Sequence, residues 1–307
     1  MKSKKMLGNG MLLFTALIWG TAFVFQRVGM ESIEPLTFSA ARMALAAVVV
    51  GIVSFLLKEK GKPALAASTA TERKQYRRNT ITGGICCGCF LAAASILQQM
   101  GLVYTSAGKA GFITAMYILL VPIIGFILFR RRNTWIIWTA VLLGVAGMYF
   151  LCITEEFTLS HGDALVCLCA LFFSFHILCC DYFAPRGDPV RISAIQFATA
   201  TVISAALAAA TEKPSIVGII SALVPIVYCG IVSGGIGYTL QIIAQKYTDP
   251  TIASLLMSME SVFAMIAGAL ILHEQLSIRE LSGCIIMFIA IVLVQLPAPA
   301  SGSAPEK

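Results

Sequence analysis

The stretch TIASLLMSMESVFAMIAGALIL, residues 251–272, is apolar apart from a few hydroxyl groups and one acid, Glu260, near its middle. It is long enough to cross a bilayer as a helix, which takes about 20 apolar residues. An ionised carboxylate at the bilayer centre costs roughly 2.5–3.5 kcal/mol, so such a group normally faces a cavity lined by protein. Glu260 is therefore the first candidate for a functional residue.

Similar apolar runs recur along the whole chain of 307 residues, which is 58% hydrophobic and only 12% charged. With a mean hydropathy of +0.88, it cannot bury its apolar surface in one water-soluble core. We predict an all-α integral membrane protein, with function residing within the spans because the connections are short. Windows of about 20 residues place ten transmembrane helices near residues 7–27, 35–57, 81–102, 110–129, 134–153, 163–183, 190–211, 215–238, 251–272 and 279–296.

The positive charges are distributed unevenly between the two sets of connections. If the N-terminus is cytoplasmic, 17 of the 22 Lys and Arg residues fall on the cytoplasmic side and Arg42 falls inside a span. The outer connections receive only Arg27, Lys109, Lys213 and Arg279. By the positive-inside rule, we predict a multi-pass protein of the cell (cytoplasmic) membrane with both termini cytoplasmic. The net charge of +7 then reports topology, and we expect no nucleic-acid partner.

The second half of the chain repeats the first. A shift of 154 residues places Pro35 on Pro189, and a shift of 143 places Gln98 on Gln241. We expect one five-helix repeat over residues 7–153, a second over 160–296, and a disordered tail over 297–307. Because five is odd, the second repeat enters the bilayer inverted, which is a recurrent plan of secondary transporters with a binding site near the midplane.

Three stretches carry a resemblance to a known family: ALIWGTAF at residues 16–23, residues 35–42, and MESVF at 259–263 with Gly268 and Glu274-Gln275-Leu276. Over about residues 7–296 the chain resembles the EamA family of the drug/metabolite transporter superfamily. The resemblance implies ten helices in two EamA repeats and export or exchange of small metabolites, often amino acids or related compounds. The chain departs from the family where Ser261 replaces the proline that commonly follows the glutamate. In the first repeat Tyr117 stands where the glutamate would be.

Two charged residues within spans are candidates for the transport site. Glu260 could bind a proton, pair with a substrate amine, or do both in turn, and a structural hydrogen bond is the alternative. Arg42 could grip a carboxylate or balance Glu260, because its guanidinium is a planar bidentate donor. Snorkelling or a structural tie between helices is the alternative for Arg42.

Four uncharged residues complete the predicted substrate site. Gln98 and Gln241 follow the glycine-interrupted segments 84–88 and 230–234, a pattern that points to a substrate-facing region in transporters. Tyr238 lies one helical turn from Gln241. Trp19 could form an apolar wall of the site, and its indole N–H needs a hydrogen-bond partner when it is buried. Packing is the alternative for each. The predicted substrate-binding residues are Glu260, Arg42, Trp19, Gln98, Tyr238 and Gln241, with proton coupling assigned to Glu260.

No catalytic motif or metal motif supports an enzyme. His273-Glu274 lacks the second histidine of HExxH, and the Cys86-Cys87-Gly88-Cys89 cluster lacks paired CxxC spacing, so we expect core packing there, no metal and no cofactor. We read His176 as a hydrogen-bonded packing residue, with a proton relay as the alternative, and place Asp181 near the cytoplasmic end of its span. We predict a secondary transporter working by alternating access on a small-molecule substrate in the lipid bilayer, with protons as a candidate coupling ion. A multidrug or cationic efflux carrier, a channel, a ligand-sensing protein and a homodimer stay open.

Overall fold

The computed structural model describes residues 2–57, 69–105, 107–131, 133–152, 160–271 and 277–295. Within these ranges the chain consists of helices joined by short connections and contains no strand, so the all-α prediction is confirmed. The predicted tail, residues 297–307, and the residues Glu274, Gln275 and Leu276 lie outside the described residues.

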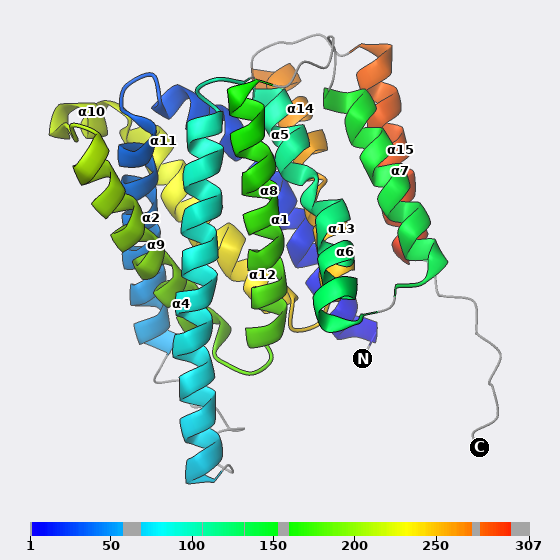
Figure 1. Ribbon diagram of the computed structural model, residues 1–307, viewed down its shortest axis with the longest axis horizontal. Coiled ribbons are helices and arrows are strands. Elements are labelled where there is room, and N and C mark those ends of the chain that lie inside the picture. Colours follow the sequence, from blue (N-terminus) through cyan, green and yellow to red (C-terminus); the bar gives the residue numbers. More distant parts are fainter. Residues whose placement is uncertain are drawn as a thin grey trace.

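The helices follow one another with short turns (Figure 1). The first half contains α1 (Lys2–Gly29), α2 (Pro35–Leu56), α4 (Ala70–Gly101), α5 (Ala107–Ala115), α6 (Tyr117–Phe129) and α7 (Trp135–Cys152). The second half contains α8 (His161–Phe183), α9 (Pro189–Thr211), α10 (Ile216–Ser221), α11 (Leu223–Val227), the π-helix η2 (Tyr228–Tyr238), α12 (Thr239–Ala244), α13 (Pro250–Met257), α14 (Glu260–Ile271) and α15 (Ile278–Gln295).

The described part of the chain holds seven helical stretches that are long and apolar enough to cross a membrane. Three shorter apolar helices accompany them, at Trp135–Phe150, Pro250–Ala264 and Leu281–Leu293. The protein is therefore a multi-pass membrane protein, while the exact count of ten crossings stays a prediction. In Figure 1, α1 begins and α15 ends at the same edge of the bundle, which is also the edge from which the start of α4 protrudes.

Local sequence signals explain where several helices begin. Pro35 and Pro189 are the first residues of α2 and α9, a position that tolerates proline because its N–H would have no helical partner. Thr69 and Ser160 cap α4 and α8, each in a reciprocal capping box with the acid three residues later. Such boxes satisfy two backbone donors at a helix start.

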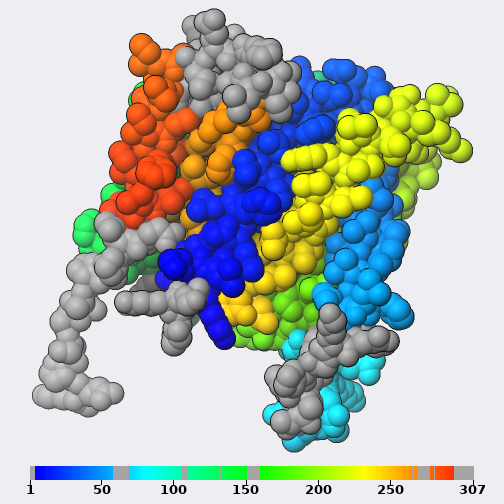
Figure 2. Space-filling model, turned by 180° about the vertical axis from the view of Figure 1, so that it is seen from behind, coloured from blue at the N-terminus to red at the C-terminus, as the bar shows by residue number. Residues whose placement is uncertain are grey.

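The packing of the helices is reciprocal between the two halves. The second helices of the two halves, α2 and α9, pack together, and so do the last helices of the two halves, α7 and α15. α8 packs against α4, and its counterpart α1 packs against η2 and α12. Figure 2 shows α1, in dark blue, crossing the face of the molecule between the yellow η2 region and the orange α14. The division into repeats at residues 7–153 and 160–296 stays a prediction.

Glycines allow two of these close helix contacts. A Cβ at Gly84 or Gly88 of α4 would lie 2.5 Å or 2.6 Å from side-chain atoms of α9. In the other half, a Cβ at Gly230 would lie 2.9 Å from the carbonyl oxygen of Arg42 on α2, and one at Gly234 would lie 3.1 Å from Ala46 Cβ. The small residues singled out in the sequence thus stand at helix–helix contacts.

Two predicted spans are broken in the middle. The span near 110–129 divides at Met116 into α5 and α6, and the span near 251–272 divides at Ser258 and Met259 into α13 and α14. At the second break the hydroxyl groups of Ser254 and Ser258 donate to the backbone carbonyls of Thr251 and Leu255, at 2.9 Å and 2.8 Å. Such local bonds compete with regular helical pairing.

The eighth span lies further along the chain than predicted. The sequence predicts it at 215–238, but the apolar stretch of sufficient length is Leu223–Ala244. Residues Ile216–Ser221 form the separate short helix α10, capped by Ser215 and interrupted at Ala222. Because α10 is itself apolar, hydropathy could not separate it from the span. The span contains the π-helix η2, and π-helical turns often occur at functional sites.

Candidate functional site

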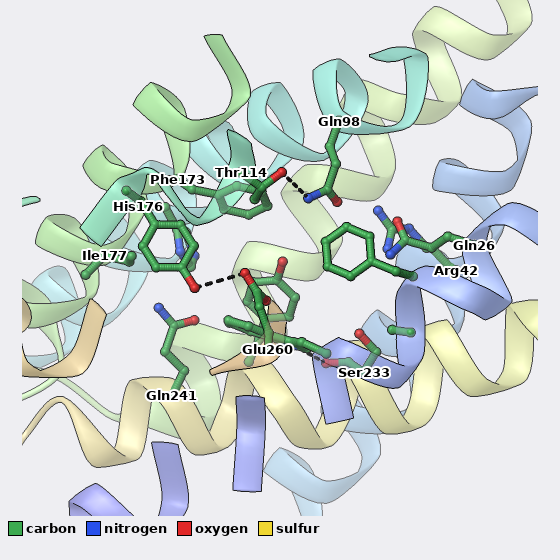
Figure 3. A pocket seen from close by; sticks show the side chains of 15 residues that line it. Gln26, Arg42, Gln98, Thr114, Phe173, His176, Ile177, Ser233, Gln241 and Glu260 are labelled. Atoms are coloured by element: carbon green, nitrogen blue, oxygen red, sulfur yellow. Dashed lines mark hydrogen bonds between the residues drawn. The ribbon is translucent and has the colours of Figure 1, made fainter. Parts of the chain in front are cut away.

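A small cavity of about 30 Å³ lies between the helices and is bounded by both halves of the chain. Its walls come from α1, α2, α4, α5 and α6 in the first half and from α8, η2, α12 and α14 in the second. Figure 3 shows its lining, which consists of Trp19, Ala22, Phe23, Gln26, Arg42, Gln98, Thr114, Tyr117, Phe173, His176, Ile177, Ser233, Tyr238, Gln241 and Glu260. All six residues predicted for the substrate site line this one cavity, and their role in binding stays a prediction.

Glu260 directly follows the break between α13 and α14. It is the first residue of α14 and is 3% exposed. The hydroxyl of Tyr117, the first residue of α6, donates to Glu260 Oε1 at 3.0 Å. The two helix breaks therefore meet at the cavity. Unpaired N–H groups at the start of a helix favour negative charge nearby, and discontinuous helices of this kind place such ends at the binding sites of many transporters.

Arg42 supplies the positive charge of the cavity from α2 and is 5% exposed. Its guanidinium carbon lies 5.9 Å from the centroid of the Phe38 ring. Among the described residues it forms no ion pair with Glu260, and its Nε has no hydrogen-bond partner. Figure 3 shows Arg42 beside Gln26, across the cavity from His176. Arg42 was expected either to bind a substrate carboxylate or to balance the charge of Glu260. The second role, as a direct ion pair, is absent from this conformation.

Gln98 and Gln241, which the shift of 143 residues places on each other, differ in their hydrogen bonding. Gln98 Nε2 donates to Thr114 Oγ1 at 3.2 Å. Gln241 is completely buried, and neither its Oε1 nor its Nε2 has a hydrogen-bond partner among the described residues. A buried polar group without a partner costs about 1–3 kcal/mol. Gln241 thus offers a free donor and a free acceptor to a molecule in the cavity.

Aromatic rings form the apolar wall. The ring centroids of Trp19 and Tyr238 lie 4.6 Å apart, close to the range preferred by packed aromatic pairs. The indole Nε1 of Trp19 donates to the carbonyl oxygen of Ser233 in η2 at 3.2 Å, which is the partner that the sequence argument required. A Cβ at Gly237 would lie 2.7 Å from that Nε1, so the glycine makes room for the indole.

His176 also lines the cavity, although the sequence favoured a packing role. Its imidazole is fully buried, and its Nε2 lies 3.0 Å from Gln196 Oε1. The His176 and Tyr238 rings meet edge to face with centroids 5.8 Å apart. Asp181, in contrast, does not line the cavity and pairs with Arg131 at 2.6 Å.

The internal repeat could have found several lining residues that polarity alone missed. The shift of 154 residues maps Trp19, Ala22 and Phe23 onto the further lining residues Phe173, His176 and Ile177. The shift of 143 maps Gln98 onto Gln241 and Tyr117 onto Glu260. Several lining residues thus fall on positions that the two sequence shifts relate to each other. Gln26, Thr114 and Ser233 had no comparable sequence signal.

Comparison with known proteins agrees with this architecture. The model of the EamA-like transporter family matches residues 6–153 and 160–296. An uncharacterized transporter of Archaeoglobus fulgidus is 26% identical over 297 residues, covering 95% of this chain and 87% of that protein. The uncharacterized transporter YoaV of Bacillus subtilis is 22% identical, covering 92% of this chain and 94% of that protein. One crystal structure shares the fold over 96% of both chains, with a TM-score of 0.73 and 17% identity. The resemblance noted in the sequence is confirmed.

Proposed function

We propose a substrate class for this membrane transporter, which belongs to the EamA-like transporter family. In this proposal it is a secondary carrier that exports or exchanges a small zwitterionic metabolite, such as an amino acid or a related compound. The binding site in this proposal is the cavity between the two repeats. Glu260 faces the substrate amine, Arg42 faces its carboxylate, and Gln241 and Gln98 offer amide groups.

One observation carries the choice of substrate class. The cavity contains a carboxyl group and a guanidinium that do not pair with each other. Burying a charge without a partner is costly, and a zwitterion would supply a partner to each. The unpartnered amide of Gln241 adds a further donor and acceptor for a polar solute.

Alternating access is the transport mechanism that the proposal includes. The breaks at Met116 and at Ser258 and Met259 allow each half-helix to tilt without unwinding the other. The π-helix η2 gives the eighth span a second point of adjustment. In this mechanism the two repeats rock about the cavity.

Efflux of organic cations is the second candidate function. Glu260 and the rings of Trp19 and Tyr238 could hold a cation without any other group, since aromatic faces attract positive charge. Against it stands Arg42, whose charge in the same cavity would repel a cation. A zwitterion is therefore the better fit.

Counterflow in proteoliposomes tests the proposal. Vesicles preloaded with a mixed pool of amino acids should accumulate labelled substrate, because a carrier exchanges solute and a pore does not. Arg42→Gln should abolish accumulation of the zwitterion, while Arg27→Gln, a change of an exposed arginine on α1, should leave it unchanged. Accumulation of organic cations that is maintained or increased in Arg42→Gln would favour the second candidate. Absence of exchange by every amino acid in the pool would refute the proposed substrate class.

The proposal also includes the finer points of location and coupling. We place the carrier in the cytoplasmic membrane with both termini cytoplasmic, and we assign protons as the coupling ion through Glu260. The carrier has no enzymatic activity in this account. A homodimer is compatible with it but is not needed to complete the cavity.

A further inference from the structure

Three side chains from α4 and α8 meet beside the cavity in an arrangement suited to a metal ion. The donor atoms of Cys87, His176 and Cys180 all lie within 4.8 Å of one another, and all three residues are buried. His176 and Cys180 are four residues apart on α8, which places them on one face of the helix. We propose that these residues bind a divalent thiophilic ion of the Zn²⁺ class.

The distances are close to those that such an ion requires. Zn–S bonds of about 2.3 Å and Zn–N bonds of about 2.0–2.1 Å in a tetrahedron put two sulfurs about 3.8 Å apart and a sulfur and a nitrogen about 3.5 Å apart. Cys87 Sγ lies 3.7 Å from Cys180 Sγ. Cys180 Sγ lies 3.9 Å from His176 Nδ1 and 3.6 Å from His176 Nε2. The two cysteine sulfurs therefore need almost no movement, and the imidazole nitrogen, which lies within 4.8 Å of both sulfurs, must approach them to complete the site.

The second nitrogen of His176 is already held in place. Nε2 lies 3.0 Å from Gln196 Oε1, and a carbonyl oxygen only accepts hydrogen bonds, so Nε2 carries the proton and Nδ1 keeps its lone pair. Metal-binding histidines characteristically donate their other N–H to an acceptor that fixes the ring orientation. Gln196 on α9 supplies that acceptor here.

Charge balance favours a divalent ion in this apolar setting. Cys87 and Cys180 sit in an apolar cluster with Ala184, Ile192 and Ile242. Binding converts two thiols to thiolates and releases two protons. Two thiolates, a neutral imidazole and a divalent ion sum to zero charge. Cys179, whose Sγ lies 3.4 Å from Cys87 Sγ, is a further thiol at the edge of the cluster.

The site would join α4 to α8 at the cavity wall. His176 lines the cavity, which gives an ion a route from the cavity to the cysteines. Occupancy would fix the imidazole next to Tyr238 and restrain the movement of α4 against α8. The proposal concerns binding and does not depend on the identity of the transported substrate.

Spectroscopic titration of the purified full-length protein tests the proposal. The reduced protein in detergent is titrated with Co²⁺, which reports thiolate ligation through a charge-transfer band and tetrahedral geometry through its visible bands. We expect saturation at one ion per chain and displacement by Zn²⁺. Cys87→Ser, Cys180→Ser and His176→Gln should each abolish or strongly reduce the bands. Cys89→Ser and Cys167→Ser, which remove exposed thiols on the same two helices, should leave them unchanged.

A second measurement on the wild type does not depend on the folding of any variant. Zn²⁺ should protect Cys87 and Cys180 from a membrane-permeant alkylating reagent, as read by mass spectrometry, and should raise Tm as a ligand of the native state does. Absence of the charge-transfer band in the wild type, or equal alkylation of Cys87 and Cys180 with and without Zn²⁺, would overturn the proposal. A disulfide between Cys87 and Cys179 that persists in reductant would overturn it as well.

Discussion

The hydroxyl of Tyr117 donates to Glu260 Oε1 at 3.0 Å, and the two residues occupy equivalent positions of the repeats, 143 residues apart. Each is the first residue of a half-helix that begins at a break. The hydrogen bond therefore joins the two broken helices at the cavity. One repeat supplies the acid and the other supplies its donor, so the two halves contribute different chemistry at the same point of the fold.

Removing this donor should impair transport. Tyr117→Phe leaves the ring in place but deprives Glu260 of a partner, at a cost of about 1–3 kcal/mol, and we expect transport to fall at least about five-fold. Initial rates of counterflow measure the effect. Tyr149→Phe, which changes a 45% exposed tyrosine on α7, is the matched control. Equal rates for Tyr117→Phe and the wild type would show that the hydrogen bond has no part in transport.

Two neighbouring glutamines on one segment should respond in opposite ways. Gln241→Leu replaces a buried amide that has no described partner with an apolar group of similar size, so we expect unchanged or higher Tm and a large rise in KM. Gln245→Leu removes a hydrogen bond from Nε2 to the carbonyl oxygen of Ile177 at 3.0 Å, so we expect lower Tm and unchanged KM. Thermal melts and counterflow kinetics on both variants make the comparison. Loss of stability without loss of affinity in Gln241→Leu would remove Gln241 from the site.

The contact between α1 and α14 leaves no room for a methyl group. A Cβ at Gly20 would lie 2.5 Å from the carbonyl oxygen of Glu260 and 2.7 Å from the amide nitrogen of Ala264. Both are backbone atoms, so Gly20→Ala must push α14 away, and overpacking of this kind costs about 1–3 kcal/mol. We expect lower Tm and reduced transport, since Glu260 moves with its backbone.

Gly10→Ala is the control for Gly20→Ala on the same helix. In the described part of the chain, nothing beyond the helix's own neighbouring backbone lies within 4 Å of a Cβ placed at Gly10. Alanine is favoured over glycine in a helix by up to about 1 kcal/mol, so Tm should be unchanged or higher. Similar melts for the two variants would mean that the close approach at Gly20 is not required.

Glu212 at the end of α9 ties the start of α2 to the second repeat. Its Oε1 accepts from the backbone N–H of Leu36 at 2.8 Å, and its Oε2 accepts from Thr37 N and Thr37 Oγ1 at 2.6 Å and 2.7 Å. Backbone N–H groups at a helix start have no partner within the helix and depend on Glu212 here. Glu212→Ala should therefore lower the free energy of unfolding by about 0.5–2 kcal/mol. KM should not change, since Glu212 does not line the cavity. Thermal melts with Glu31→Ala as control would detect the loss, and a Tm equal to that of the control would show that the tie contributes nothing.

Apolar runs of about 20 residues were enough to predict the helical membrane architecture. The polar residues within those runs were enough to single out Glu260, Arg42, Gln98 and Gln241, which meet in the cavity. Such residues are conspicuous because each is costly in a bilayer. Tyr117 was marked in the sequence only as the repeat counterpart of Glu260, because a tyrosine in an apolar helix is ordinary. The hydrogen bond between the two residues is visible only in the structure.

Other features depend on tertiary structure and have no local signal. The break at Met116 has neither proline nor glycine beside it, so no propensity rule predicted it. The eighth span was misplaced because the short helix α10 is as apolar as a span. The cluster of Cys87, His176 and Cys180 was missed because its members come from two helices and form no sequence motif.

The role of Glu260 is tested most directly by measuring counterflow over a range of pH in Glu260→Gln. Glu31→Gln, which changes an exposed acid in the turn after α1, is the control. If Glu260 carries the coupling proton, the wild type and Glu31→Gln will show the same pH dependence. Glu260→Gln, while remaining folded by thermal melt, will lose that dependence. A pH profile of Glu260→Gln identical to that of the wild type would contradict the account and make Glu260 a structural residue.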